Sequence, residues 1–65
     1  MNILENINLT DKIYTPDEVA AILKIPKSTV CYLLRNRELK GAKIGRQWRI
    51  SKKQLEIFIE DNTTN

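Results

Sequence analysis

Residues 15–36 have the sequence TPDEVAAILKIPKSTVCYLLRN, and this stretch decides the fold. It opens with a helix start, because Thr15 can cap the helix, the following proline suits the first helical position and Glu18 completes a capping box. The helix is expected to end near Lys24, since the next residue, Ile25, precedes a proline and is pushed away from helical backbone angles. The stretch therefore begins with one short helix.

A second helix is expected from Pro26 to about Asn36, after a turn of only three or four residues. Two short helices joined by so tight a turn define a helix-turn-helix motif. With about 100° of rotation per residue, the side chains of Ser28, Tyr32 and Arg35 share one face of this helix, opposite its apolar side chains. The outward face of the second helix is therefore polar and partly cationic.

A β-hairpin is predicted after the second helix, because the apolar period changes to two from Leu39 onward. A two-residue turn at Gly45 and Arg46 would mix apolar and polar residues on both faces of the hairpin. We therefore expect a three-residue loop, Gly45-Arg46-Gln47, which sorts the two kinds of side chain onto separate faces.

The expected register assigns each hairpin side chain to a face. The predicted pairs, counted from the loop, are Ile44 with Trp48 inward, Lys43 with Arg49 outward and Ala42 with Ile50 inward. Trp48 is accordingly assigned to packing. Like charges that face one another cost stability, so the outward pair suggests that an anion such as phosphate lies nearby.

A third helix should start at Ser51, because Ser51 to Gln54 form a second capping box. The predicted fold is thus α+β and mainly α, a small winged helix-turn-helix with a hairpin wing and a C-terminal helix. Residues 1–12 are expected to form an N-terminal extension, residues 13–60 the winged domain and residues 61–65 a disordered tail.

The apolar face of each helix predicts the core. The core residues expected from the three faces are Val19, Ile22 and Leu23, then Val30, Leu33 and Leu34, then Leu55, Phe58 and Ile59. Cys31 falls at the border of the second face. Ile57 lies away from the third face, so either the extension's Ile3, Leu4 and Ile7 or another copy of the protein covers it, or it is an ordinary surface isoleucine.

Charge is distributed unevenly along the chain. Between Lys24 and Lys53 there are ten basic residues and one acid, Glu38, a balance of +9. Since the whole chain carries +3, the remaining residues carry −6. A basic block between acidic flanks is typical of a surface that binds a polyanion, with DNA phosphates the first candidate and a merely solvated basic face the alternative.

Composition excludes several kinds of function. The chain has no histidine and one cysteine, which removes the usual nucleophile pairs and the zinc sites that need several Cys or His ligands. No segment has the roughly 20 apolar residues of a membrane span, and Glu5 interrupts the apolar residues that a signal peptide would need. We expect no enzymatic activity, no cofactor and no small-molecule substrate, and a reducing cytoplasmic, nucleoid-associated location.

Four segments together resemble a known family: YTPDEVA (14–20), ILKIPKSTV (22–30), Leu39-Lys40 and KIGRQWRI (43–50). In order and spacing they resemble excisionase-type members of the MerR-like helix-turn-helix superfamily, from Tyr14 to about Glu60. Two residues depart from the pattern: Lys24 replaces a common glycine, and Pro26 replaces a capping Ser or Thr.

The resemblance implies that the second helix enters the major groove of DNA while the wing contacts the backbone or the minor groove. The candidate DNA-binding residues are Lys27, Ser28, Thr29, Tyr32 and Arg35 on the helix, and Lys43, Arg46, Gln47 and Arg49 on the wing. Lys27 and Thr29 also lie at a helix start, where backbone amides favour phosphate.

Two biological uses follow from the resemblance. One is a recombination directionality factor that acts with an integrase on a bacterial or phage mobile element, and the other is a small transcriptional repressor. A third hypothesis, of a different class, is a winged protein-interaction module that uses its basic face. Because one copy offers little interface for high specificity, further copies on DNA are also expected.

Overall fold

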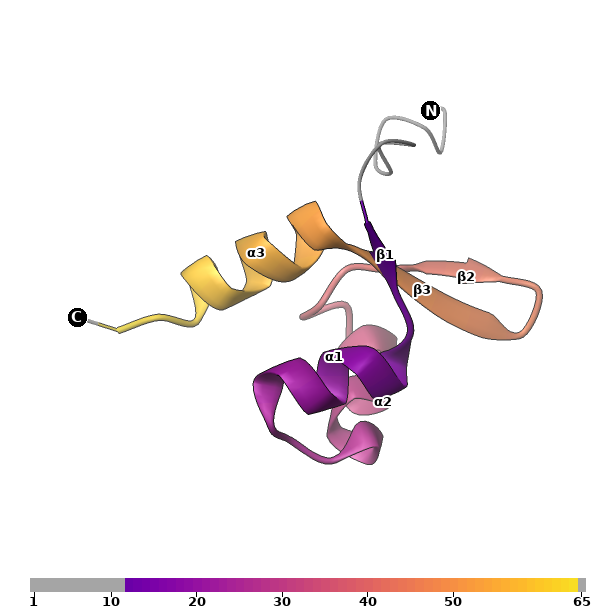
Figure 1. Ribbon diagram of the computed structural model, residues 1–65, viewed down its shortest axis with the longest axis horizontal. Coiled ribbons are helices and arrows are strands. Elements are labelled where there is room, and N and C mark those ends of the chain that lie inside the picture. The colour runs from indigo at the N-terminus through magenta and orange to yellow at the C-terminus, as the bar shows by residue number, and fades with distance from the viewer. Residues whose placement is uncertain (1–11, 65) are drawn as a thin grey trace.

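The computed structural model describes residues 12–64. In chain order the elements are β1 (Ile13–Tyr14), α1 (Pro16–Leu23), α2 (Lys27–Arg35), β2 (Ala42–Ile44), β3 (Gln47–Ser51) and α3 (Lys52–Asp61) (Figure 1). The strands form one antiparallel sheet in the order β1-β3-β2. This arrangement confirms the predicted winged helix-turn-helix.

The first helix starts as predicted. The backbone amide of Glu18 donates to the Thr15 hydroxyl at 3.2 Å, and the Thr15 amide donates to the Glu18 carboxylate at 2.8 Å. After Leu23 the chain turns through Lys24, which has a left-handed backbone with φ of 58°. The amide of Ile25 donates to the Ala20 carbonyl at 3.1 Å, which closes the end of α1.

Three residues, 24–26, separate the two helices, and α2 begins directly after Pro26. Pro26 is the N-cap and makes no side-chain capping bond. The turn is therefore as short as expected, and α1 and α2 pack against each other across it.

The core lies where the helices meet β3. Its buried residues come from α1, α2, the following loop, β3 and α3: Val19, Val30, Leu34, Leu39, Ile50 and Leu55. Three predicted core residues are wrong, because Ile22, Ile44 and Ile59 are 47%, 58% and 41% exposed. In α1 the buried stripe runs instead through Val19, with Ala20 and Leu23 packed beside it, so Ile22 turns outward.

The predicted hairpin register is wrong. The strands pair Ala42 with Arg49, Lys43 with Trp48 and Ile44 with Gln47, around a two-residue turn. Gly45 has a φ of +64°, whereas Arg46 is not among the residues with positive φ. Glycine first in a two-residue turn is the arrangement of type II′ hairpins, whose twist matches that of the strands, so turn geometry outweighs the sorting of side chains. Lys43 and Arg49 are therefore not paired across the strands, and the inference of a nearby phosphate from their like charges no longer holds.

Two further features of the sheet differ from expectation. β1 was not predicted, yet Ile13 pairs with Ser51 and Tyr14 with Ile50, which makes β3 the central strand. Leu39 does not start a strand, but lies fully buried in the loop before β2.

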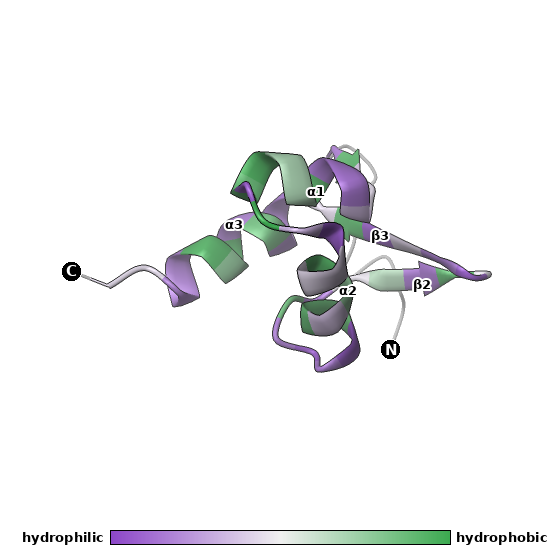
Figure 2. Ribbon diagram, turned by 90° about the horizontal axis from the view of Figure 1, so that it is seen from below, coloured by the Kyte–Doolittle hydropathy of each residue, from purple (hydrophilic) through white to green (hydrophobic). Residues whose placement is uncertain are grey.

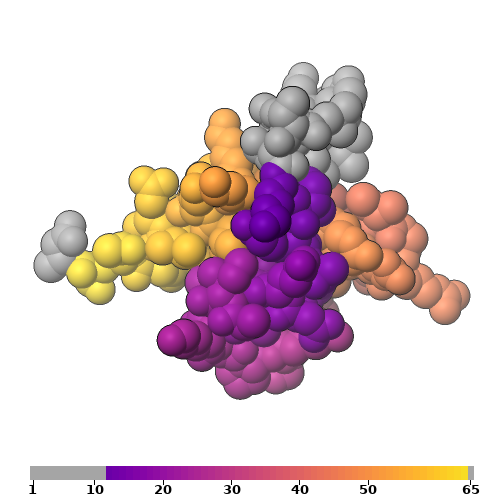
Figure 3. Space-filling view, in the orientation of Figure 1, coloured from indigo at the N-terminus to yellow at the C-terminus, as the bar shows by residue number. Residues whose placement is uncertain are grey.

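The third helix starts at the predicted N-cap, Ser51, where one of the two bonds of the predicted capping box is formed. The Gln54 amide donates to the Ser51 hydroxyl at 3.2 Å, and Ser51 is itself buried. The amide of Lys52 donates to the Lys12 carbonyl at 2.9 Å, which ties the start of α3 to the start of β1. The hairpin and α3 project on opposite sides of the body (Figure 3). Ile57 is 38% exposed, while Ile3, Leu4 and Ile7, its suggested cover, lie outside the described residues.

Candidate nucleic-acid interface

The outward face of α2 is polar and exposed, as the helical period predicts. Ser28, Tyr32 and Arg35 are exposed, as are Lys27 and Thr29 near the start of the helix. The inward face carries the buried Val30 and Leu34, with Cys31 half-buried at the border. The five helix residues proposed to contact DNA are thus all accessible to a partner.

The hairpin projects from the body beside α2 and has a hydrophilic tip (Figure 2). Arg46 occupies the turn and is exposed, as is Gln47, the next residue. A two-stranded ribbon that ends in a cation is suited to reach the backbone of a bound duplex.

A groove of about 420 Å³ lies between the hairpin and the first turns of both helices. Its lining residues come from three places in the chain: Thr15, Pro16 and Asp17; Lys27 and Cys31; and Arg46, Gln47, Trp48 and Arg49. The tertiary structure therefore brings Lys27 of the helix set together with Arg46, Gln47 and Arg49 of the wing set.

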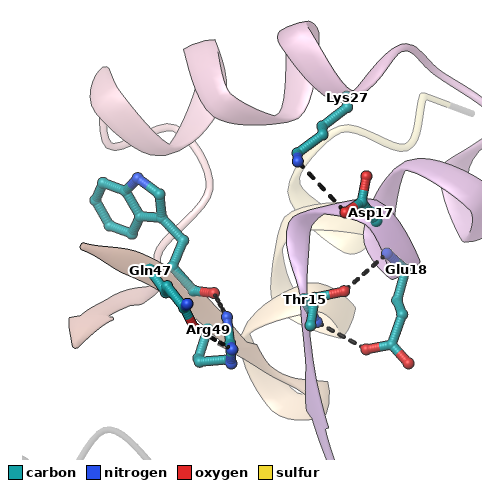
Figure 4. Close-up of polar contacts among 7 residues, drawn as sticks. Thr15, Asp17, Glu18, Lys27, Gln47 and Arg49 are labelled. Atoms are coloured by element: carbon teal, nitrogen blue, oxygen red, sulfur yellow. Dashed lines mark hydrogen bonds and ion pairs between the residues drawn. The ribbon is translucent and has the colours of Figure 1, made fainter. Parts of the chain in front are cut away.

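Polar contacts hold both walls of this groove (Figure 4). On the hairpin side, Arg49 donates from Nη1 to the Trp48 carbonyl at 2.7 Å and from Nη2 to Gln47 Oε1 at 2.6 Å. On the helix side, Lys27 Nζ lies 3.3 Å from Asp17 Oδ2. Arg49 is thus a half-buried, oriented part of the wall, whereas the Lys27 head is exposed.

Lys43 takes a different position from the one predicted. It does not line the groove, and its ammonium lies 5.5 Å from the centroid of the Trp48 ring. The register explains this contact, because directly paired residues of two strands point to the same face. Trp48 packs against the core with its other contacts, which agrees with its predicted packing role.

Among the described residues, Asp17 is the charged groove residue that the sequence did not mark as functional. An acid in the first turn of α1 suits the helix dipole, so its position there by itself indicates no ligand. Its pairing with Lys27 depends on how α1 and α2 pack, for which the chain carries no local signal.

Within residues 12–64 no group of three or more His, Cys, Asp and Glu side chains is placed to hold a metal ion. The helices of this part of the chain are all too short or too polar to cross a membrane.

An exposed polar helix face, together with a groove that joins helix and wing cations, defines a winged helix-turn-helix DNA-binding domain. The family model of a helix-turn-helix domain matches residues 13–63, and the chain belongs to this family. The protein is therefore a DNA-binding helix-turn-helix protein. Neither a curated protein nor a solved structure gives a significant match to the chain.

Proposed function

We propose that this protein binds duplex DNA with α2 in the major groove and the hairpin on the adjacent backbone or minor groove. The supporting observation is the groove in which Lys27 of α2 meets Arg46 and Arg49 of the hairpin. A phosphate strand that runs beside an inserted helix would meet these cations, while the major groove, about 12 Å wide, accepts one helix.

The candidate residues divide into two roles. Lys27, Arg46 and Lys43 contact phosphates and supply affinity, because cations contribute a term that is independent of sequence. Ser28, Tyr32 and Arg35 face the base edges from the outward side of α2 and supply sequence preference. The remaining three residues, Thr29 on α2 and Gln47 and Arg49 on the hairpin, position the DNA backbone beside the inserted helix.

A salt titration with random-sequence duplex DNA tests this function. Log affinity should fall linearly with log salt concentration, and Arg46→Ala should flatten the slope by about one unit, because one phosphate contact is lost. Lys53→Ala is the matched control, since it removes an equal charge from α3 outside the groove. If no variant binds duplex DNA even at low salt, a protein-interaction module becomes the better explanation.

We further propose that the biological role is that of an excision factor that acts beside an integrase, as the resemblance of the chain from Tyr14 to about Glu60 to excisionase-type proteins suggests. Such a factor works by shaping attachment-site DNA. End-to-end fluorescence transfer on a selected duplex should therefore report a bend of tens of degrees on binding. A bound but straight duplex would contradict this role and leave repression by occlusion.

A further inference from the structure

One acidic side chain, Asp17, lies in a groove whose other charged lining residues in the described chain are Lys27, Arg46 and Arg49. Its carboxylate is 3.3 Å from the ammonium of Lys27. Asp17 comes from α1 and Lys27 from α2, so the contact bridges the two helices (Figure 4).

The two side chains are only loosely held. The side chain of Asp17 is 71% exposed and that of Lys27 is 56% exposed, and ion pairs this exposed are weak because water screens them. A phosphate, with its stronger charge-assisted hydrogen bonds, can therefore take the place of the carboxylate on Lys27. A phosphate that approaches Lys27 also approaches Asp17, and like charges at such a distance repel.

We propose that a DNA backbone phosphate binds in this groove to Lys27 and Arg46, and that Asp17 competes with it for Lys27. Asp17 thereby acts as a brake on binding to DNA of any sequence, since every duplex presents the same phosphates. Contacts of α2 with the bases are unaffected by this competition, so the brake lowers the affinity for specific and non-specific duplexes by the same factor. The inference rests on the proposed mode of DNA binding and adds a regulator to it.

The first test replaces the acid without altering its size. Asp17→Asn should bind random-sequence duplex DNA about two- to fivefold more tightly at moderate salt, the scale of one exposed ion pair. The salt slope should steepen by up to about 0.9, because Lys27 then contributes a full phosphate contact. Glu60→Gln is the matched control, as it removes the same charge from α3 outside the groove, and its affinity should change less.

A double-mutant cycle separates competition for Lys27 from a general charge effect. In the Lys27→Gln background, Asp17→Asn should raise the affinity for duplex DNA by a smaller factor than it does in the wild-type background, because only direct repulsion between Asp17 and phosphate is then relieved. If Asp17→Asn raises the affinity for DNA equally in both backgrounds, Asp17 does not compete with phosphate for Lys27. Because Asp17 also lies in the first turn of α1, thermal unfolding is measured for each variant, and Asp17→Ser provides a second uncharged residue that suits a helix start.

Cys31 reports on the groove directly. It lines the same groove and is the one cysteine of the chain, so iodoacetamide modifies a single known position. Bound random-sequence duplex DNA should slow this alkylation severalfold. If DNA binds with normal salt dependence but leaves the alkylation rate and the Asp17→Asn affinity unchanged, the groove inference fails while DNA binding stands. If no variant binds DNA, the proposed function itself fails.

Discussion

Two cations of the helix-turn-helix occupy backbone conformations that suit glycine. Lys24 and Arg37 have φ values of 58° and 61°, and they follow α1 and α2. A left-handed conformation costs a non-glycine residue about 1–2 kcal/mol. Lys24, at the position where the resemblance leads one to expect glycine, is therefore under local strain, and the hydrogen bond from the Ile25 amide to the Ala20 carbonyl helps to hold the turn in this conformation.

Replacing Lys24 by glycine should stabilise the protein. Lys24→Gly is expected to raise the free energy of unfolding by about 0.5–1 kcal/mol, because the relief of strain exceeds the added chain entropy of glycine. Urea denaturation measures the change. Lys53→Gly, the same substitution inside α3, should instead lower stability by about 1 kcal/mol. A loss of stability in Lys24→Gly would show that the Lys24 side chain makes a contact worth more than the strain.

At the scale of elements, two serine variants distinguish a serine that caps a helix from a serine that contacts DNA. Ser51→Ala should cost about 1 kcal/mol of stability, because it removes the bond from the Gln54 amide at the buried start of α3. Ser28→Ala, on the exposed face of α2, should change stability by less than about 0.5 kcal/mol but weaken DNA binding. Thermal unfolding and a binding titration read the two effects, and an exchange of the two outcomes would contradict the assignment of these serines.

The hairpin register makes a sharp prediction for two isoleucines. Ile50 is fully buried, so Ile50→Ala should cost about 2–5 kcal/mol and leave so small a domain largely unfolded. Ile44 is 58% exposed, so Ile44→Ala should cost less than about 1 kcal/mol. Circular dichroism during urea titration measures both variants. Equal, large losses would instead support the three-residue loop, in which both side chains face the core.

At the scale of the whole molecule, one copy is small for a sequence-specific binder. The described residues, 12–64, extend over 32 × 28 × 20 Å, and this part of the chain presents one helix and one wing to DNA in the proposed binding mode. Specific protein–DNA interfaces bury about 1,000–2,500 Å² of protein surface, which favours more than one copy per site. Sedimentation velocity on a duplex selected from a random library should therefore show two or more copies at saturation. A complex that stays at one copy would refute cooperative assembly.

The sequence by itself determined the helices and their order. Caps such as Thr15 with Glu18, and Ser51 with Gln54, act over three residues, and Pro26 limits the turn locally. The polar face of α2 also follows from helical period alone. These features could be predicted because each depends on residues that are neighbours in the chain.

Only the tertiary structure decided the register of the hairpin, the pairing of β1 with β3, the burial of Leu39 and the contact of Asp17 with Lys27. The sorting of side chains predicted one register, but the backbone of Gly45 and the twist of the strands selected the other. The remaining contacts join segments far apart in the sequence or depend on how helices pack, which no local pattern encodes. The groove between helix and wing is therefore a property of the fold, although each of its cations is visible in the sequence.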